Sequence, residues 1–351
     1  MNLILSNRIV VSLIQSVNMV KVICFILLIV ALPKTQLAQD IHFSQVNRQP
    51  LFQNPANTGL FNGDLRLTAN HKDQWRSVSV PFKTSVFAID AKTKLNGLSI
   101  GCLLFHDQVG DGALQTVEAL LSAAKHVQLT TDGHQKLAFG LQLGLNYRQL
   151  NWNKFYFDNQ FNGLFFDPTI PITETIANTS TKNSTVGTGI VYTNELDTKN
   201  KFTIGLSGHN LNRPNQGFFG TTIKRDARLS LYGTYEYLFS TQFHFIPGFS
   251  FNAQGKYKEL LIGSQVKYIL TDRKGLYQAV DAGIWMRTKD AFVVRLGAAI
   301  QNWSVGLSYD INISKLAVAS NFRGGLELSA CYIITRFKPK KSTYKVCPDF
   351  L

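Results

Sequence analysis

The pentapeptide Gly97-Leu98-Ser99-Ile100-Gly101 has the G-x-S-x-G spacing of a hydrolase nucleophile elbow. In such an elbow the serine lies on a sharp turn from a strand into a helix, which exposes its hydroxyl as a nucleophile. Here apolar residues keep alternating with small or polar ones as far as Phe105, and no helical pattern follows. The sequence therefore predicts Ser99 within a strand, and it predicts no enzymatic activity.

Histidine and acidic residues are the other groups that could do chemistry, as metal ligands. The seven histidines show no i, i+4 pair or other chelating spacing; they are His42, His71, His106, His126, His134, His209 and His244. Asp107 and Asp111 could offer oxygens to calcium, but the later bidentate acid of an EF-hand loop is missing, which favours an ordinary glycine-supported turn. We expect neither a metal nor a cofactor.

Cysteines are few and do not form a paired framework. Cys102, Cys331 and Cys347 follow the N-terminal leader described below, and three cysteines allow one bridge at most. Buried or free thiols are the simpler interpretation, and a bridge between Cys331 and Cys347 stays open.

Alternation of apolar and polar residues is the strongest structural signal. From Leu137 to Tyr147, and again from Trp303 to Ile313, every second residue is large and apolar. Such a strand has one apolar and one polar face. Charged residues make up only 17% of the chain, against about a quarter in ordinary proteins, and no long segment has a helical period. The pattern predicts an all-β protein but leaves open whether the apolar face meets lipid or a protein core.

Strand length and loop placement favour lipid. Many candidate strands are close to the ~9 to 11 residues that cross a bilayer when tilted. The long connections 152–184 and 211–226 fall on one side, whereas the opposite side has short turns, as in outer-membrane barrels. We predict a 14-stranded antiparallel transmembrane β-barrel with strands at residues 64–74, 82–92, 97–106, 113–128, 134–151, 184–194, 201–211, 226–239, 242–254, 259–269, 277–288, 291–301, 302–313 and 322–337.

The two ends of the chain carry further signals. Lys21 precedes the apolar run Val22–Leu32, which predicts a secretory signal peptide over residues 1–39, starting at Met1 or Met19. The formal net charge is +14, but the basic residues are spread singly apart from a cluster in the tail 338–351, which we expect to be periplasmic. Exported proteins with dispersed charge are poor candidates for nucleic-acid binding, so anionic lipid or an acidic partner explains the charge better.

The segment after the predicted signal has an unusual pattern. Its key positions are Asp40, Phe43, Ser44, Gln45, Asn54, Pro55, Ala56 and Gly59, followed by Gln74 and Trp75 at the end of the first predicted strand. This pattern resembles the opening of the PorP/SprF family of type IX secretion system membrane proteins, D-x-x-F-S-Q, then N-P-x-x-x-N-P-A-x-x-G, then N-Q-W. The tail Cys347-Pro348-Asp349-Phe350 resembles the C-P-x-F ending of that family. The chain departs from the pattern at Gln49, at Asn57-Thr58 and at Asp73.

The resemblance implies an outer-membrane β-barrel of the Bacteroidetes that acts with the type IX secretion machinery, in export of cargo or in surface anchoring of gliding adhesins. The expected organisation is an amide- and proline-rich segment 40–63 in or under a barrel of residues 64–337. Within it, the candidates for a plug or strap, or for direct partner binding, are Phe43, Ser44, Gln45, Asn54, Pro55, Gly59, Gln74 and Trp75.

The expected partners are type IX secretion components, a secreted adhesin or cargo protein, and outer-membrane lipid. The long loops would meet cargo, while the tail and the periplasmic turns would meet secretion components. Two alternatives stay open: an outer-membrane channel for small or hydrophobic solutes, and a soluble secreted β-protein such as an adhesin or lectin.

Overall fold

The computed structural model describes most of the chain after the predicted signal peptide. The described residues are 41–74, 81–110, 113–151, 154–155, 157–171, 179–197, 200–218, 220–273, 276–314 and 317–335. They all belong to one compact unit, Gln39–Leu351. The predicted signal peptide 1–39 and the predicted tail 338–351 lie outside them.

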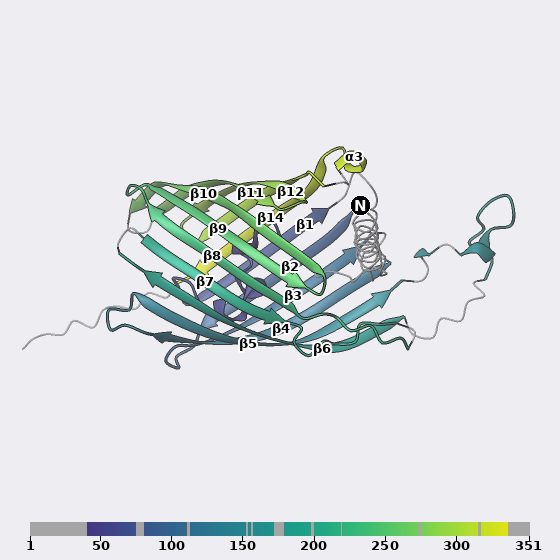
Figure 1. The fold of residues 1–351 in the computed structure, drawn as a ribbon, viewed down its shortest axis with the longest axis horizontal. Coiled ribbons are helices and arrows are strands. Elements are labelled where there is room, and N and C mark those ends of the chain that lie inside the picture. Colours follow the sequence, from purple (N-terminus) through teal and green to yellow (C-terminus); the bar gives the residue numbers. More distant parts are fainter. Residues whose placement is uncertain are drawn as a thin grey trace, which may run out of the picture. The chain divides into compact units, whose positions relative to one another are not determined.

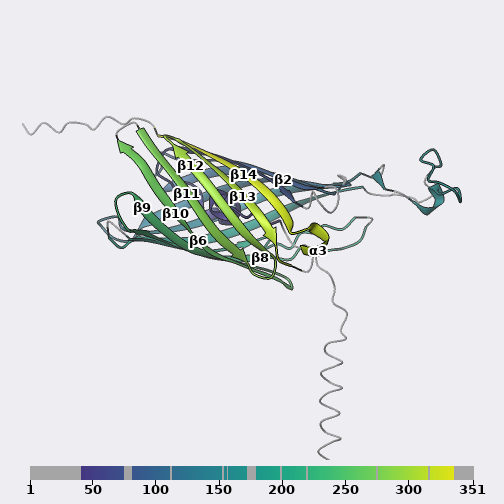
Figure 2. The same ribbon diagram turned by 90° about the horizontal axis from the view of Figure 1, so that it is seen from above.

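Fourteen antiparallel strands form a closed barrel (Figures 1 and 2). The strands are β1 (Leu65–Gln74), β2 (Phe82–Lys92), β3 (Leu98–Val109), β4 (Leu114–Gln128), β5 (Gln135–Leu150), β6 (Ser180–Glu195), β7 (Asn200–His209), β8 (Arg228–Leu238), β9 (Phe243–Gln254), β10 (Tyr257–Arg273), β11 (Leu276–Arg287), β12 (Ala291–Ile300), β13 (Trp303–Asn312) and β14 (Arg323–Ile334). Each pairs with its sequence neighbours, and β1 closes on β14 from Leu65↔Ile334 to Gln74↔Gly325. The predicted fold and strand number are confirmed.

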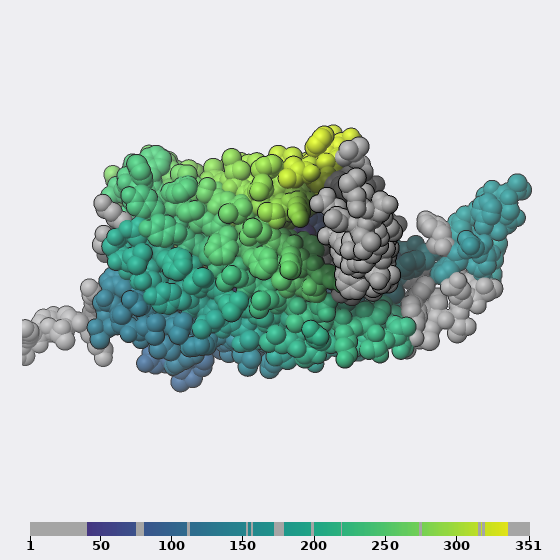
Figure 3. All heavy atoms as spheres, in the orientation of Figure 1, coloured from purple at the N-terminus to yellow at the C-terminus, as the bar shows by residue number. Residues whose placement is uncertain are grey.

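The faces of the strands are reversed relative to a soluble protein. On β5, Leu143 and Leu145 are 55% and 71% exposed, whereas Gln142 before them and Asn146 after them are buried. Large apolar side chains point outward around the ring, and the wall seen in the space-filling view is closely covered by side chains (Figure 3). Because water would not favour this outer surface, the apolar face meets lipid.

The two ends of the barrel differ. We call the end with the long connections 151–179 and 210–227 the loop end; it also holds the connection between β13 and β14, with the short helix α3 (Ala317–Ser320). The opposite end, which we call the turn end, has the connections 93–97, 129–134 and 239–242, the start of β1 and the end of β14. The predicted sorting of long and short connections is therefore confirmed.

Some strand bounds differ from the prediction. β6 begins at Ser180 rather than 184, because Gln149 and Ser180 start the β5–β6 ladder within a stretch that is polar on both faces and so shows no alternation. β10 spans Tyr257–Arg273 rather than 259–269, with a bulge between Ile269 and Thr271 where the alternation breaks.

The segment before β1 lies inside the ring of strands, as both ribbon views show in purple (Figures 1 and 2). It contains three short elements, η1 (Val46–Arg48), α2 (Pro50–Gln53) and η2 (Pro55–Asn57), and the second and third each begin with a proline. Ala56 packs with Ala138 and Val191 from the wall, so part of the hydrophobic core lies between the segment and the strands. Among the described residues, no helix is both long and apolar enough to cross a membrane.

The outward apolar face gives a first prediction. Leu143→Arg places a charge near the middle of β5 on the lipid side, and we expect the folded, inserted barrel to lose about 2–4 kcal/mol of stability. Gln149→Arg, near the loop end of the same strand, should cost about 1 kcal/mol or less. Urea unfolding in lipid vesicles, followed by heat-modifiable gel mobility, measures both, and equal losses would contradict a lipid-facing β5.

Candidate functional site

Glu327 on β14 holds the start of the lumenal segment. The backbone N–H groups of Ser44 and Gln45 donate to its two carboxylate oxygens at 2.6 and 3.0 Å, and Asn70 Nδ2 on β1 donates at 2.8 Å. The Gln45 amide donates to the Glu327 carbonyl at 2.9 Å and accepts from Ser329 Oγ at 2.7 Å. Hydrogen bonds to a buried charge contribute about 1.5–3 kcal/mol each, so this is a strong anchor.

The Ser44 hydroxyl lies at the centre of a buried charge cluster. Its Oγ donates to Asp310 Oδ2 at 2.7 Å and accepts from Arg287 Nη2 at 2.7 Å and Lys72 Nζ at 3.2 Å. Arg287 and Lys72 are themselves 3.1 and 3.4 Å from the Asp310 carboxylate. Because isolated buried charges are costly, the hydrogen bonds of this hydroxyl to all three side chains stabilise the cluster within the barrel.

Phe43 supplies the apolar part of this anchor. It is almost fully buried in a cluster with Leu51, Leu103 and Phe105, and its ring meets that of Phe52 edge to face at 5.0 Å. The Phe43-Ser44-Gln45 triplet thus fixes the segment by packing, by a hydroxyl and by two backbone donors.

Asn54 fixes the middle of the segment to the opposite wall. Its Nδ2 donates to the carbonyls of Ile190 on β6 and Leu206 on β7, both at 3.1 Å, and its Oδ1 accepts from Ala56 N at 2.8 Å. The approach requires a glycine, because a Cβ on Gly189 would lie 2.0 Å from Asn54 Oδ1.

Pro55 begins η2 and brings the backbone against β5. A Cβ on Gly140 would lie 2.3 Å from the Pro55 carbonyl carbon and 2.2 Å from Ala56 N. The N-P-A tripeptide and the glycines on the wall are therefore complementary surfaces.

Gly59 ends the lumenal segment near the turn end. Its φ of +76° is a left-handed conformation that glycine adopts without strain, and a Cβ there would overlap Ser99 Oγ. Gly59 N donates to Asp90 Oδ2 at 2.7 Å, while Arg66 makes a bidentate pair with the same carboxylate at 2.9 and 2.7 Å. Arg66 also donates to the Asn57 carbonyl at 3.0 Å.

Ser99, the serine of the G-x-S-x-G pentapeptide, lies on β3 as predicted and is 2% exposed. The strand continues beyond it to Val109.

Gln74 and Trp75 are not brought together with the residues above. Gln74 ends β1 at the loop end, opposite Phe82 and Gly325, and Trp75 lies outside the described residues. The structure therefore gathers Phe43, Ser44, Gln45, Asn54, Pro55 and Gly59 into one lumenal segment and leaves Gln74 at the rim.

Several anchoring residues were not among the sequence candidates. Arg48 donates to Ser304 Oγ at 2.7 Å and to Asp281 Oδ1 at 3.1 Å, and it occupies space that a side chain on Gly297 would fill. Charged residues on the small-residue face of a strand, such as Asp281, were a visible signal for the lumen. Their partners in the segment could not be identified from spacing.

The cavities inside the barrel are small near the segment and larger at the loop end. Two cavities beside Phe52 have volumes of about 30 Å³ each, roughly the space of one water molecule. A cavity of about 620 Å³ opens at the loop end, with His42, Gln74, Arg287 and Asp310 among its lining residues.

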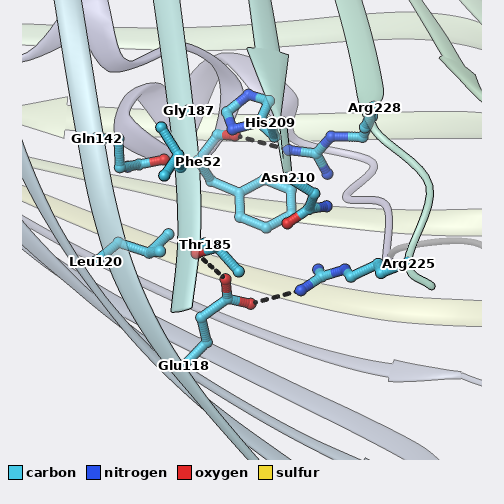
Figure 4. Close-up of a pocket in the computed structure, with 11 residues that line it drawn as sticks. Phe52, Glu118, Leu120, Gln142, Thr185, Gly187, His209, Asn210, Arg225 and Arg228 are labelled. Carbon is cyan, nitrogen blue, oxygen red and sulfur yellow. Dashed lines mark hydrogen bonds and ion pairs between the residues drawn. The ribbon is translucent and has the colours of Figure 1, made fainter. Parts of the chain in front are cut away.

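The connection 210–227 reaches into the lumen at the loop end. Its Arg225 forms an ion pair of 3.3 Å with Glu118 on β4, and Glu118 also accepts from Thr185 on β6 (Figure 4). Arg148 on β5 donates to the Gln216 carbonyl and side chain at 3.0 and 3.1 Å. The connection therefore spans part of the opening.

The connection 151–179 instead presents apolar side chains to solvent. Phe161, Leu164 and Phe165 are 55%, 87% and 60% exposed, and Asn162 Oδ1 braces the turn by accepting from two backbone N–H groups. Hydrogen bonds from the Thr169 hydroxyl and backbone lower the pKa of the Asp167 carboxyl on the same loop.

Within the described part of the chain, no three His, Cys, Asp or Glu side chains gather as metal ligands. Cys102 and Cys331 are free thiols, and Cys347 lies outside the described residues.

The Glu327 anchor gives a second prediction. Glu327→Ala leaves the buried N–H groups of Ser44 and Gln45 without their acceptor, at a cost of about 1–3 kcal/mol. We expect amide exchange at these two residues to accelerate about tenfold or more while the barrel stays folded. Glu195→Ala, which removes a half-exposed acid on β6 that pairs only with Lys201 at 3.5 Å among the described ion pairs, is the matched control. Unchanged exchange in Glu327→Ala would show that the anchor does not hold the segment.

The chain was compared with curated protein sequences and with solved structures. No curated protein sequence matches the chain. Among solved structures, the Ralstonia pickettii toluene transporter TbuX is similar, with 10% identity, a TM-score of 0.48, and 81% of this chain and 92% of that chain covered. The CymD monoaromatic hydrocarbon channel has 11% identity, a TM-score of 0.47 and coverages of 82% and 93%. A Pseudomonas aeruginosa FadL homologue has 9% identity, a TM-score of 0.44 and coverages of 81% and 94%.

A family model provides the assignment. The model described as type IX secretion system membrane protein PorP/SprF matches residues 35–332, which include the lumenal segment and nearly all of the fourteen strands. This confirms the resemblance drawn from Phe43 to Gly59, and together with the closed lipid-facing barrel it gives the location as the outer membrane. The chain belongs to the PorP/SprF family of type IX secretion system membrane proteins.

Proposed function

We propose that this protein is an outer-membrane component of the type IX secretion system that supports export or surface anchoring of secreted proteins or gliding adhesins. The observation that carries the proposal is the family match over residues 35–332. The family-like residues from Phe43 to Gly59 also lie in the lumen, which supports a barrel that binds and holds rather than one that conducts. This role needs no catalysis.

In this proposal the lumenal segment 43–59 acts as a plug. Its supports are contacts on several sides of the wall: with Glu327 on β14, with Ile190 and Leu206 on β6 and β7, and with Asp90 on β2. The spaces left beside Phe52 are close to one water molecule in volume. A plugged lumen leaves the ends and the outer wall as the binding surfaces.

The two ends would serve different partners. Outer-membrane barrels carry short turns on the periplasmic side and longer loops outside, so the loop end is assigned to the cell surface. The connection 151–179, with exposed Phe161, Leu164 and Phe165, is the surface offered to cargo or adhesin. The turn end, with the basic tail beyond the described residues, is offered to periplasmic secretion components.

Deletion and crosslinking test the proposal. A strain lacking this protein should retain its cargo in the periplasm or lose it from the cell surface, and re-expression of the protein should restore it. After crosslinking in cells, a tagged copy should recover type IX components, with an unrelated tagged outer-membrane barrel as the control. Recovery of no type IX component would contradict the assignment.

Conductance separates the proposal from a channel for small or hydrophobic solutes. In planar bilayers we expect the full protein to be sealed and the protein lacking residues 41–59 to conduct, because the polar lumen would then be open. Since the deletion could impair folding, a Glu327→Ala, Asp90→Ala double variant that weakens both anchors is the second test, with Glu195→Ala as the control. A conducting full protein would favour the channel, and a sealed lumen in every variant would exclude it.

A further inference from the structure

One row of outward-facing residues changes character between β1 and β3. The strand register places these residues side by side, in the order Leu307, Leu328, His71, Ser85, His106, Val117 and Tyr147. The row is aliphatic on one flank, on β13 and β14, and apolar or aromatic on the other, on β4 and β5. The three residues between are polar, and we call them the polar notch.

The polar notch faces away from the lumen. His71 and His106 are exposed on the outer wall, and each alternates with a buried inward residue on either side along its strand. His71 Nδ1 lies 2.9 Å from Ser85 Oγ, so the notch is partly hydrogen-bonded within itself. Ionisable side chains in membrane-spanning segments are rare and typically mark functional contacts, because lipid tails cannot satisfy them.

An apolar groove adjoins the notch on the outer wall. It has a volume of about 590 Å³, and His71, Ser85 and His106 are among its lining residues. The groove is deepest where two small side chains are paired in register, Ala69 on β1 and Ala330 on β14. Small residues that allow close approach, next to side chains that can hydrogen-bond, are the composition of protein–protein contacts inside membranes.

The charges beside the notch argue against a bound lipid headgroup as its main occupant. In the next outward row, Asp73 on β1 is paired in register with Lys83 on β2, so that row has no excess positive charge to attract an anionic headgroup. A partner protein does not need such an excess, since it can offer hydrogen-bonding side chains to the histidines and apolar side chains to the groove.

We propose that the notch and groove on β1–β3 and β14 form a lateral docking surface for a second membrane-embedded protein. The partner would insert apolar side chains over Ala69 and Ala330 and hydrogen-bond to His71, Ser85 and His106. The proposal rests on the proposed function, in which this barrel works within an assembly, and it names the part of the outer wall through which the assembly forms.

Photocrosslinking in living cells tests this surface. A photoreactive amino acid replaces Ser85 or Leu104 on this wall, or Ile262 or Leu141 on other lipid-facing strands as matched controls. We expect Ser85 and Leu104 to give an adduct with an outer-membrane protein, identified by mass spectrometry, about tenfold more abundant than at the control positions. Equal protein adducts at all four positions, or lipid adducts alone, would overturn the proposal.

Removing the polar groups provides the second arm. With the photoreactive residue at Leu104, the triple change His71→Leu, Ser85→Val, His106→Leu extends the apolar wall and should leave the barrel folded, as heat-modifiable mobility would verify. The adduct should fall about tenfold, equivalent to about 1.4 kcal/mol of binding. An adduct of unchanged abundance would overturn the role of the notch.

Failure of this inference is distinguishable from failure of the proposed function. If crosslinked pull-downs recover type IX components but Ser85 and Leu104 give no protein adduct, the lateral surface is wrong and the function stands. If these positions capture a membrane protein outside the secretion system, and the triple change removes it, the surface stands and the function is wrong.

Discussion

The rest of the structure depends on the hydrogen bonds that join β1 to β14. In a bilayer an unpaired strand edge has no water to satisfy its N–H and C=O groups, each at a cost of several kcal/mol, so a membrane sheet must close. Closure fixes one face of every strand toward lipid and the other toward an enclosed interior. The apolar residues of the alternation occupy the first face, which leaves charged residues such as Arg287 and Glu327 in the second. Those charges need partners, and the segment before β1 provides many of them.

The dependence between segment and wall is mutual. The backbone N–H groups of Ser44 and Gln45 would lose their acceptor without the Glu327 carboxylate, and Asn54 could not approach the wall if Gly189 carried a side chain. The family pattern in the opening of the chain is therefore half of an interface whose other half is spread over strands far away in sequence. The polar notch around His71 is a different case, because its residues face outward and no part of the described chain covers them.

Much of the fold could be predicted from the sequence. Apolar and polar residues alternate with a period of two because one face of each strand meets lipid and the other faces the polar lumen. The start of β6 at Ser180 could not be predicted, since a strand that is polar on both faces has no period to detect. The segment residues could be singled out by family-like spacing, but their contacts could not. The ion pair between Arg48 and Asp281 forms because the closed barrel brings β11 next to the lumenal segment, and no spacing in the sequence predicts it. The short elements η1, α2 and η2 were also beyond prediction, because they are too brief to show a helical period.

The direction in which the segment crosses the lumen has a consequence for how the protein is made. Ser44 lies beside Arg287 and Lys72, near the loop end of their strands, whereas Gly59 lies beside Asp90 and Ser99, near the turn end. The chain therefore descends through the ring before it enters β1, the strand that completes the ring. A polypeptide tied to several sides of a finished cylinder would have to be threaded into it past all of those contacts. Biogenesis is simpler if the strands assemble around the segment, with the β1–β14 seam forming last, so that the N-terminal residues act as the internal template on which the cylinder is closed.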